Sequence, residues 1–241
     1  MNRLRNFAFR ATRLALPFVV GSVTLAQAVV VPNSLAAAEG NSSETLPFYS
    51  SGFMRFQQVY DASQFSAMSG GAFISAMRFR PDSVQGAAFS HSTTIDVWLS
   101  TTAFAPDNLS STFADNVGAD ETQVFSGSVA LSSANTGGVP RDFDVVLTFS
   151  TPFLYNPANG NLLWEVKRYS ATTTFHYLDA EDTFGDSISM LWNEPSAQAP
   201  TGVARTSGLV TKFDFVPVPE PTTAVALALG ALALARRRTR T

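Results

Sequence analysis

The stretch NLLWEVKRY, residues 161–169, alternates in the manner of a β-strand that buries one face. Leu162, Trp164 and Val166 point to one side of an extended chain, and the residues between them, two of which are charged, point to the other. Large apolar side chains at a period of two residues therefore predict a strand that forms part of a hydrophobic core.

The same alternation recurs along most of the chain. In residues 94–100, Ile95, Val97 and Leu99 share a face. Turn signals rich in Gly, Pro and Asn separate such runs, and no window shows a sustained helical period. The other expected strands cover residues 53–60, 72–80, 122–129, 142–150, 173–178, 187–192 and 209–215. About nine short strands predict an all-β fold, a β-sandwich of the jelly-roll kind, over residues 53–216.

The composition narrows the chemistry available to the chain. Its 241 residues include no Cys and only two His, His91 and His176. Without Cys there are no disulfides, thiolate metal sites or Cys nucleophiles, and two His offer little for a His-rich metal site or a Ser-His-Asp triad. The sequence contains no phosphate-binding loop, dinucleotide-binding fingerprint or nucleophile-elbow motif.

The charges are distributed unevenly. Half of the 16 basic residues lie in the first 13 and the last six positions, whereas residues 39–218 hold all but one of the 19 acidic residues. An acidic body repels phosphate backbones, so we expect no nucleic-acid partner. The same charge favours solubility and can attract divalent cations.

Residues 1–38 are predicted to be a secretory signal. Four Arg precede an apolar stretch over residues 14–31, and small residues offer two signal-peptidase sites. Cleavage is expected after Ala38, because residues 32–34 provide an extended polar approach, and cleavage after Ala28 is the alternative. An uncleaved membrane anchor is a further interpretation, although the apolar stretch is interrupted by polar residues.

Residues 39–52, between the predicted signal and the sandwich, are polar and predicted to be a linker.

The end of the chain differs in composition from the sandwich. Beyond the sandwich, residues 217–221 (PVPEP) are expected to be extended, because proline fixes the backbone. Residues 222–235 then form an uncharged Ala/Leu-rich helix of about 21 Å, short of a hydrocarbon core of about 30 Å. The Arg cluster that follows favours the cytoplasmic side, which places the body outside the inner membrane.

This tail resembles the PEP-CTERM protein-sorting signal. The resemblance rests on three parts in order: Pro219, Glu220 and Pro221, then the apolar helix 222–235, then Arg236, Arg237 and Arg238. Two stretches of the body, RFQQVYDASQF (55–65) and SSTFADNVGADETQVFSG (110–127), are similar to secreted proteins that share the tail and are mostly uncharacterised.

The resemblance implies a Gram-negative bacterium that makes extracellular polysaccharide. It implies that an exosortase, a membrane Cys protease, recognises the Pro-Glu-Pro motif and cuts nearby. The helix is then a transient membrane anchor, and the Arg cluster is a stop-transfer signal. The body is expected at the cell surface, in the extracellular matrix of a biofilm or in the medium. Exosortase and signal peptidase are the implied processing partners, and this chain is their substrate.

One acidic cluster has the composition of a structural Ca²⁺ site. Four carboxylates and a Gly fall within residues 179–186, and Ca²⁺ prefers oxygen ligands. The predicted ligands are Asp179, Glu181, Asp182 and Asp186. A second acidic stretch, residues 115–121, is another candidate. The alternative interpretation of both is an ordinary acidic surface loop, and no other cofactor is expected.

Aromatic side chains on a sandwich surface could stack on sugar rings. The candidates are Trp98, Tyr155 and Tyr169, with Trp192 and Tyr177 as further possibilities. Trp98 is expected on the face opposite Ile95 and Val97, and polysaccharide would be the partner. The alternative is that these rings belong to the core.

The sequence therefore predicts an exported, non-enzymatic sandwich with a structural or adhesive role. A carbohydrate-binding module is the first alternative. A secreted hydrolase is the second, since Asp142, Asp144 or Glu165 could supply paired carboxylates for glycoside hydrolysis.

Overall fold

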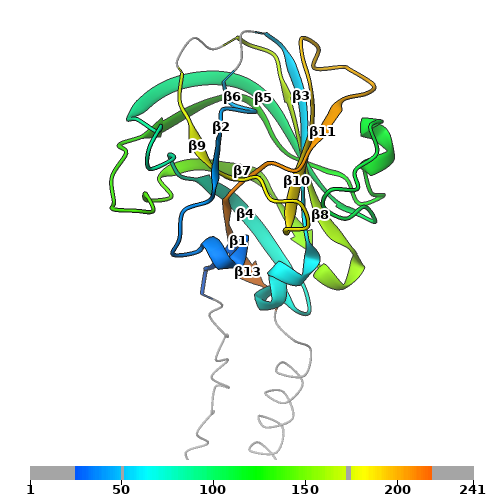
Figure 1. Cartoon of the computed structure of the whole chain (residues 1–241). Helices are drawn as coiled ribbons and strands as arrows, with labels where there is room; N and C mark the ends of the chain where they lie inside the picture. The colour runs from blue at the N-terminus through cyan, green and yellow to red at the C-terminus, as the bar shows by residue number, and fades with distance from the viewer. Residues whose placement is uncertain (1–24, 50–51, 172–174, 219–241) are drawn as a thin grey trace, which may run out of the picture. The chain divides into compact units, whose positions relative to one another are not determined.

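The alternating runs of the sequence form strands in three antiparallel sheets (Figure 1). The computed structural model describes residues 25–49, 52–171 and 175–218. The helices of this part are short 3-10 turns: η1 (Asn33–Leu35), η2 (Ala62–Met68), η3 (Phe113–Asn116) and η4 (Pro157–Asn159).

The largest sheet has six strands. In spatial order they are β11 (Val203–Arg205), β10 (Ile188–Asn193), β3 (Met54–Tyr60), β8 (Asn161–Arg168), β5 (Phe89–Thr102) and β6 (Thr122–Ser133). The register places Gln57 of β3 beside Glu165 of β8, and Glu165 beside Trp98 of β5. Strand β8 is therefore central, and its outward polar residues meet those of both neighbours.

A second sheet has four strands and packs against the first. Its order is β1 (Gln27–Val31), β13 (Thr211–Pro217), β4 (Ala72–Phe79) and β7 (Val145–Tyr155). Strand β1 is an edge strand, with Gln27 opposite Phe215 and Val31 opposite Thr211 (Figure 1). The described chain therefore begins beside the strand with which it ends.

A small third sheet connects distant segments. It contains β12 (Gly208–Leu209), β9 (Leu178–Glu181) and β2 (Ser42–Glu44). Strand β9 is the middle strand, so residues near position 42 and residues near position 208 both pair with it.

The core between the two larger sheets confirms the predicted all-β sandwich. Trp164 of β8 is fully buried and stacks on Phe79 of β4, with ring centroids 5.4 Å apart. Phe48 and Phe56 also contact Trp164, at 6.1 Å and 5.3 Å. The predicted inward residues of residues 94–100 are all fully buried. In β5 and β7 the alternation therefore separates mostly buried from more exposed residues as the sequence predicts, whereas β3, β8 and β10 are largely buried on both faces.

Two predicted boundaries are wrong. The segment 39–52 is not a simple linker, because it contains β2 and contributes Leu46 and Phe48 to the core. The sandwich also begins before residue 53, since β1 pairs with β13. The two errors have different causes: β2 is short and polar, whereas β1 overlaps the end of the apolar stretch that was assigned to the secretory signal.

No helix in residues 25–49, 52–171 and 175–218 is long and apolar enough to cross a membrane. The predicted helix 222–235 and residues 1–24 of the predicted signal lie outside these residues.

Candidate functional site

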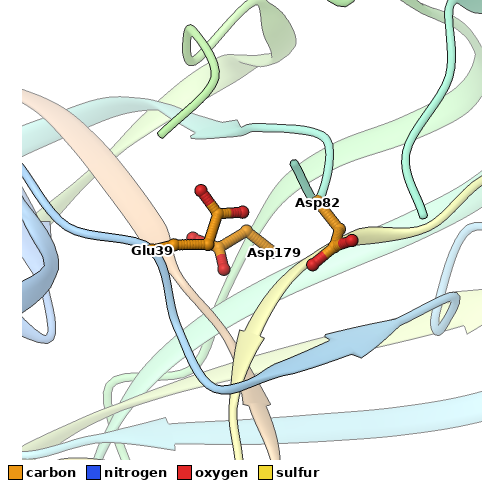
Figure 2. Close-up of side chains that lie close together, drawn as sticks. All are labelled: Glu39, Asp82 and Asp179. Atoms are coloured by element: carbon orange, nitrogen blue, oxygen red, sulfur yellow. The ribbon is translucent and has the colours of Figure 1, made fainter. Parts of the chain in front are cut away.

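Three carboxylates from distant segments converge at one point of the sandwich, and Figure 2 shows them. Glu39 lies between η1 and β2, Asp82 follows β4, and Asp179 is on β9. Each offers one carboxylate oxygen, and these oxygens all lie within 4.8 Å of one another. Asp82 and Asp179 are buried, and Glu39 is half-buried. We call this group, together with Arg80, the acidic clasp.

Arg80 provides the cation of the acidic clasp. Its Nη2 lies 2.6 Å from Asp179 Oδ2, and the two side chains are only 1% and 0% exposed. Burial raises the pKa of Asp179 to about 6, and the nearby Glu39 carboxylate contributes, while Arg80 opposes the shift. The Arg80 guanidinium also donates to Leu35 O at 3.0 Å and to Ala38 O at 2.5 Å. One buried cation thus joins the chain before β2 to the sandwich.

Most carboxylate oxygens of the acidic clasp already have protein donors. Asp82 Oδ1 accepts hydrogen bonds from the backbone N–H groups of Val84 and Gln85. Glu39 Oε1 accepts from Ser83 N at 2.8 Å, whereas Glu39 Oε2 is buried and has no hydrogen-bond partner. A Ca²⁺ ion needs six to eight oxygen ligands, and a guanidinium already neutralises part of this group. These contacts are therefore more typical of a group that joins chain segments than of an open cation-binding site.

The predicted Ca²⁺ ligands do not act as one group. Asp179 belongs to the acidic clasp, and the others accept hydrogen bonds from separate partners. Glu181 accepts from Thr183 Oγ1 and Asn41 N, Asp182 from Thr206 Oγ1, and Asp186 from Ile188 N. Within the described part of the chain, the three-carboxylate group that converges pairs Asp179 with Glu39 and Asp82 instead. Ca²⁺ binding itself stays a prediction.

An open cleft of about 590 Å³ lies beside this acidic loop. Its lining includes Asp61, Glu181, Asp186 and residues 32–35. Burial raises the pKa of Asp186 to about 6, and the carboxylates of Asp107 and Glu181 contribute. The segment that leads from β1 to the acidic clasp therefore also forms one wall of the cleft.

The outer face of the six-stranded sheet carries a connected set of charges around Trp98. Glu165 is almost fully buried, and its carboxylate forms an ion pair with Arg55 at 3.0 Å and contacts Lys167 Nζ at 3.4 Å. Lys167 Nζ in turn lies 4.4 Å from the centroid of the half-buried Trp98 ring. Gln57 also donates to Glu165. The carboxylate considered for hydrolysis is thus engaged by three side chains.

Tyr169 lies near this charged face, but Tyr155 does not. Burial raises the pKa of Tyr169, and a hydrogen bond with Asp96 adds to the shift. In register, Asp96 lies opposite Lys167, so Tyr169 and Trp98 border one surface. Tyr155 is fully buried, donates to Gly160 O at 2.9 Å and packs against Phe65. The prediction of Tyr155 as a sugar-stacking residue is therefore wrong, because its ring belongs to the core.

The remaining predicted acids hold loops. Asp142 Oδ2 accepts from Thr136 Oγ1, and Asp144 Oδ2 accepts from Ala134 N. In the second acidic stretch, Asp120 Oδ1 accepts from both the backbone and the hydroxyl of Thr101. Each of these carboxylates has a local structural partner.

The two histidines form a ring stack with Phe89. The His91 and His176 ring centroids are 4.8 Å apart, and His176 stacks on Phe89 at 4.0 Å. Both ring nitrogens of His91 are buried and have no hydrogen-bond partner. Burial lowers the pKa of His91, and the positive charge of Arg168 lowers it further.

This environment predicts a loss of stability in mild acid. The unfolded chain binds a proton at His91 near its ordinary pKa of about 6.5, and the folded chain resists protonation. The free energy of unfolding should therefore fall as the pH decreases below about 6.5, and His91→Phe should reduce this decrease. Urea denaturation at pH 7.5 and 5.5 measures the effect. Equal pH dependence in the wild type and the variant would contradict it.

The raised carboxyl pKa values act in the opposite direction. Asp179 and Asp186 bind protons more readily in the folded chain, so each favours folding as the pH falls below about 6. The wild type and the His91→Phe variant both retain Asp179 and Asp186. The difference between their pH dependences of stability therefore isolates the contribution of His91.

The fold and its ion-pair networks define an all-β sandwich stabilised without disulfides, since the sequence has no Cys. Residues 217–239 match a family model described as the PEP-CTERM protein-sorting motif. The chain therefore carries a PEP-CTERM protein-sorting signal. No curated protein and no solved structure matches the chain.

The match includes every residue of the predicted sorting motif. Pro219, Glu220 and Pro221 fall at its start, and Arg236, Arg237 and Arg238 at its end. These residues lie outside the described part of the chain. The motif makes the chain a substrate for exosortase and an exported protein of the cell envelope.

The sequence could not reveal the acidic clasp. Glu39, Arg80 and Asp179 are separated by 41 and 99 positions, and although Asp179 lies in the acidic cluster of residues 179–186, nothing in the sequence pairs it with Glu39 or Arg80. The signal that was available is weaker: Arg80 and Asp82 follow a strand directly, where polar side chains of neighbouring strands can meet.

Proposed function

We propose that this protein is a non-enzymatic component of the cell surface or the extracellular polysaccharide matrix. The sandwich is the delivered body, with a structural or adhesive role, and the tail is its delivery signal. One observation carries the proposal: the sorting motif begins at Pro217, the last residue of β13. The chain has no further domain between the sandwich and the signal, so the sandwich is what the signal delivers.

The engagement of the carboxylates supports a role without catalysis. A glycoside hydrolase needs one carboxyl group that is free to give a proton and another that faces the sugar. Glu165 is instead held by Arg55, Lys167 and Gln57. Asp142 and Asp144 hold the loop before β7.

The processing of the tail tests the proposal. We expect the mature protein from its native host to lack the residues after the Pro-Glu-Pro motif and to leave the inner-membrane fraction. Replacement of Pro219, Glu220 and Pro221 by Ala should retain the tail and keep the protein in the inner membrane. Intact mass with cell fractionation measures both outcomes.

A matched control comes from the same tail. Arg240→Ala changes a basic residue that lies after the matched motif and should leave processing unchanged. A wild-type protein that keeps residues 222–241 and stays in the inner membrane would contradict the proposal. The chain would then be a membrane-anchored periplasmic domain.

A specific observation also favours the second candidate, polysaccharide binding. Trp98 and Tyr169 border one face that also presents Lys167 and Asp96. Sugar-binding surfaces combine aromatic rings with a few directed polar groups. If the role is adhesive, this face is the proposed contact with extracellular polysaccharide.

We expect Trp98→Ala to weaken retention on polysaccharide from the native host by about tenfold or more, as for a central aromatic contact. Affinity electrophoresis of the folded sandwich measures the retention. Phe184→Ala is the control, because this Phe is 80% exposed and lies away from the face. Equal retention of both variants and the wild type would exclude this face as the binding surface.

A further inference from the structure

The exposed fraction of the chain changes sharply within β1. Leu25, Ala26, Gln27 and Ala28 are all exposed, whereas Val29 is half-buried and packs against the core. Two residues later the burial is complete, since Val31 has no exposed surface. Gln27 and Ala28 also pair with β13, but the strand contributes buried side chains to the sandwich only from Val29 onward.

Residues 29–31 are part of the second sheet. They pair with Phe213, Lys212 and Thr211 of β13. Removal of β1 would leave this side of β13 as an exposed sheet edge, and such an edge has unpaired backbone groups that promote association with other chains. Residues 29–31, which include the core residue Val31, are therefore needed to complete the edge of the second sheet.

The following segment is held even more firmly. Asn33 N donates to Gln64 Oε1 at 2.8 Å, and Arg80 donates to Leu35 O and Ala38 O. Gly40 N donates to Asp179 Oδ1 at 2.9 Å, and a Cβ at this Gly would clash with the backbone of Ala180. Without residues 29–38, buried donors of Arg80 would lose their acceptors, and an unsatisfied buried donor is destabilising.

We infer that signal peptidase cleaves this chain after Ala28, and that Val29 is the first residue of the mature protein. The inference rests on the proposed export of the sandwich. Ala26 and Ala28 supply the small residues that the enzyme requires, and they are the last exposed positions before burial begins. Cleavage after Ala38, the site expected from the sequence, would instead remove β1, η1 and both backbone acceptors of Arg80.

The experiment follows the full-length precursor in a Gram-negative host with a general secretory pathway. Mass spectrometry identifies the first residue of the exported protein, which should be Val29. Two matched substitutions, Ala28→Arg and Ala38→Arg, each place a large charged residue before one cleavage site. Both positions are exposed, so neither change disturbs the core.

We expect the Ala28→Arg precursor to remain uncleaved, and the Ala38→Arg precursor to be processed to Val29 as in the wild type. A mature chain that begins at Glu39, with processing blocked by Ala38→Arg alone, would overturn the inference and leave export intact. A wild-type chain that keeps residues 1–28 in the membrane would instead overturn the cleavable signal and with it the proposed route of export.

Discussion

Replacement of Arg80 by Met is expected to lower the free energy of unfolding by about 3–5 kcal/mol, as is usual when one partner of a buried ion pair is removed. The substitution leaves the Asp179 carboxylate buried next to Glu39 without a cation, because Arg80 and Asp179 are almost inaccessible. It also removes the donors to Leu35 O and Ala38 O. Urea denaturation at pH 7.5 measures the loss.

The pH dependence of the variant provides a further check. The pKa of Asp179 is already raised to about 6 with Arg80 present, and loss of the cation raises it further. At pH 5 the carboxyl is largely protonated, so the destabilisation by Arg80→Met should be smaller than at pH 7.5.

Arg78→Met is the matched control. Arg78 lies two residues before Arg80, within β4, and pairs with Asp214 at 2.6 Å, but their side chains are 35% and 21% exposed. Partly exposed ion pairs contribute only about 0–1 kcal/mol. Equal small losses for Arg78→Met and Arg80→Met would show that the acidic clasp does not hold the sandwich together.

The second large effect is expected for Trp164→Ala. Trp164 is fully buried between the two larger sheets and contacts Phe48, Phe56 and Phe79. Truncation of a large buried aromatic side chain leaves a cavity and typically destabilises by about 3–5 kcal/mol. The thermal midpoint and the urea midpoint should both fall strongly, or the chain should fail to accumulate as folded protein.

Trp164→Phe and Trp98→Ala separate the possible outcomes. Trp164→Phe keeps an aromatic ring in the core and should recover part of the loss. Trp98→Ala removes the same side chain from the half-buried outer face and should have a much smaller effect. If Trp98→Ala destabilises as much as Trp164→Ala, the assignment of the inner and outer faces of β5 and β8 is wrong.

These two residues illustrate what the sequence could predict. Trp164 and Trp98 both lie in alternating runs, and the phase of each run correctly assigned one ring to the core and the other to the surface. Tyr155 was missed by the same reasoning, because the strand was expected to end at residue 150. Strand β7 continues to Tyr155, and the phase of Val145 and Leu147 carries Tyr155 to the inner face.

The rest could not be predicted because it depends on contacts between distant segments. Strand β1 overlaps the end of an apolar export stretch, and its three consecutive Val residues have no alternation. Strand β2 is three residues long and polar, and only its pairing with β9 defines it. The acidic clasp requires both of these segments to be in place before its carboxylates meet.

The position of β13 has a mechanical consequence. Hydrogen bonds to β1 and β4 flank this strand on both sides, and the sorting tail continues directly from its last residue. Tension applied to the end of β13 along the strand axis acts at right angles to the bonds of both antiparallel ladders. Such a load shears many bonds together and does not open them one after another. A pull along β13 from its last residue therefore meets the resistance of both ladders at once.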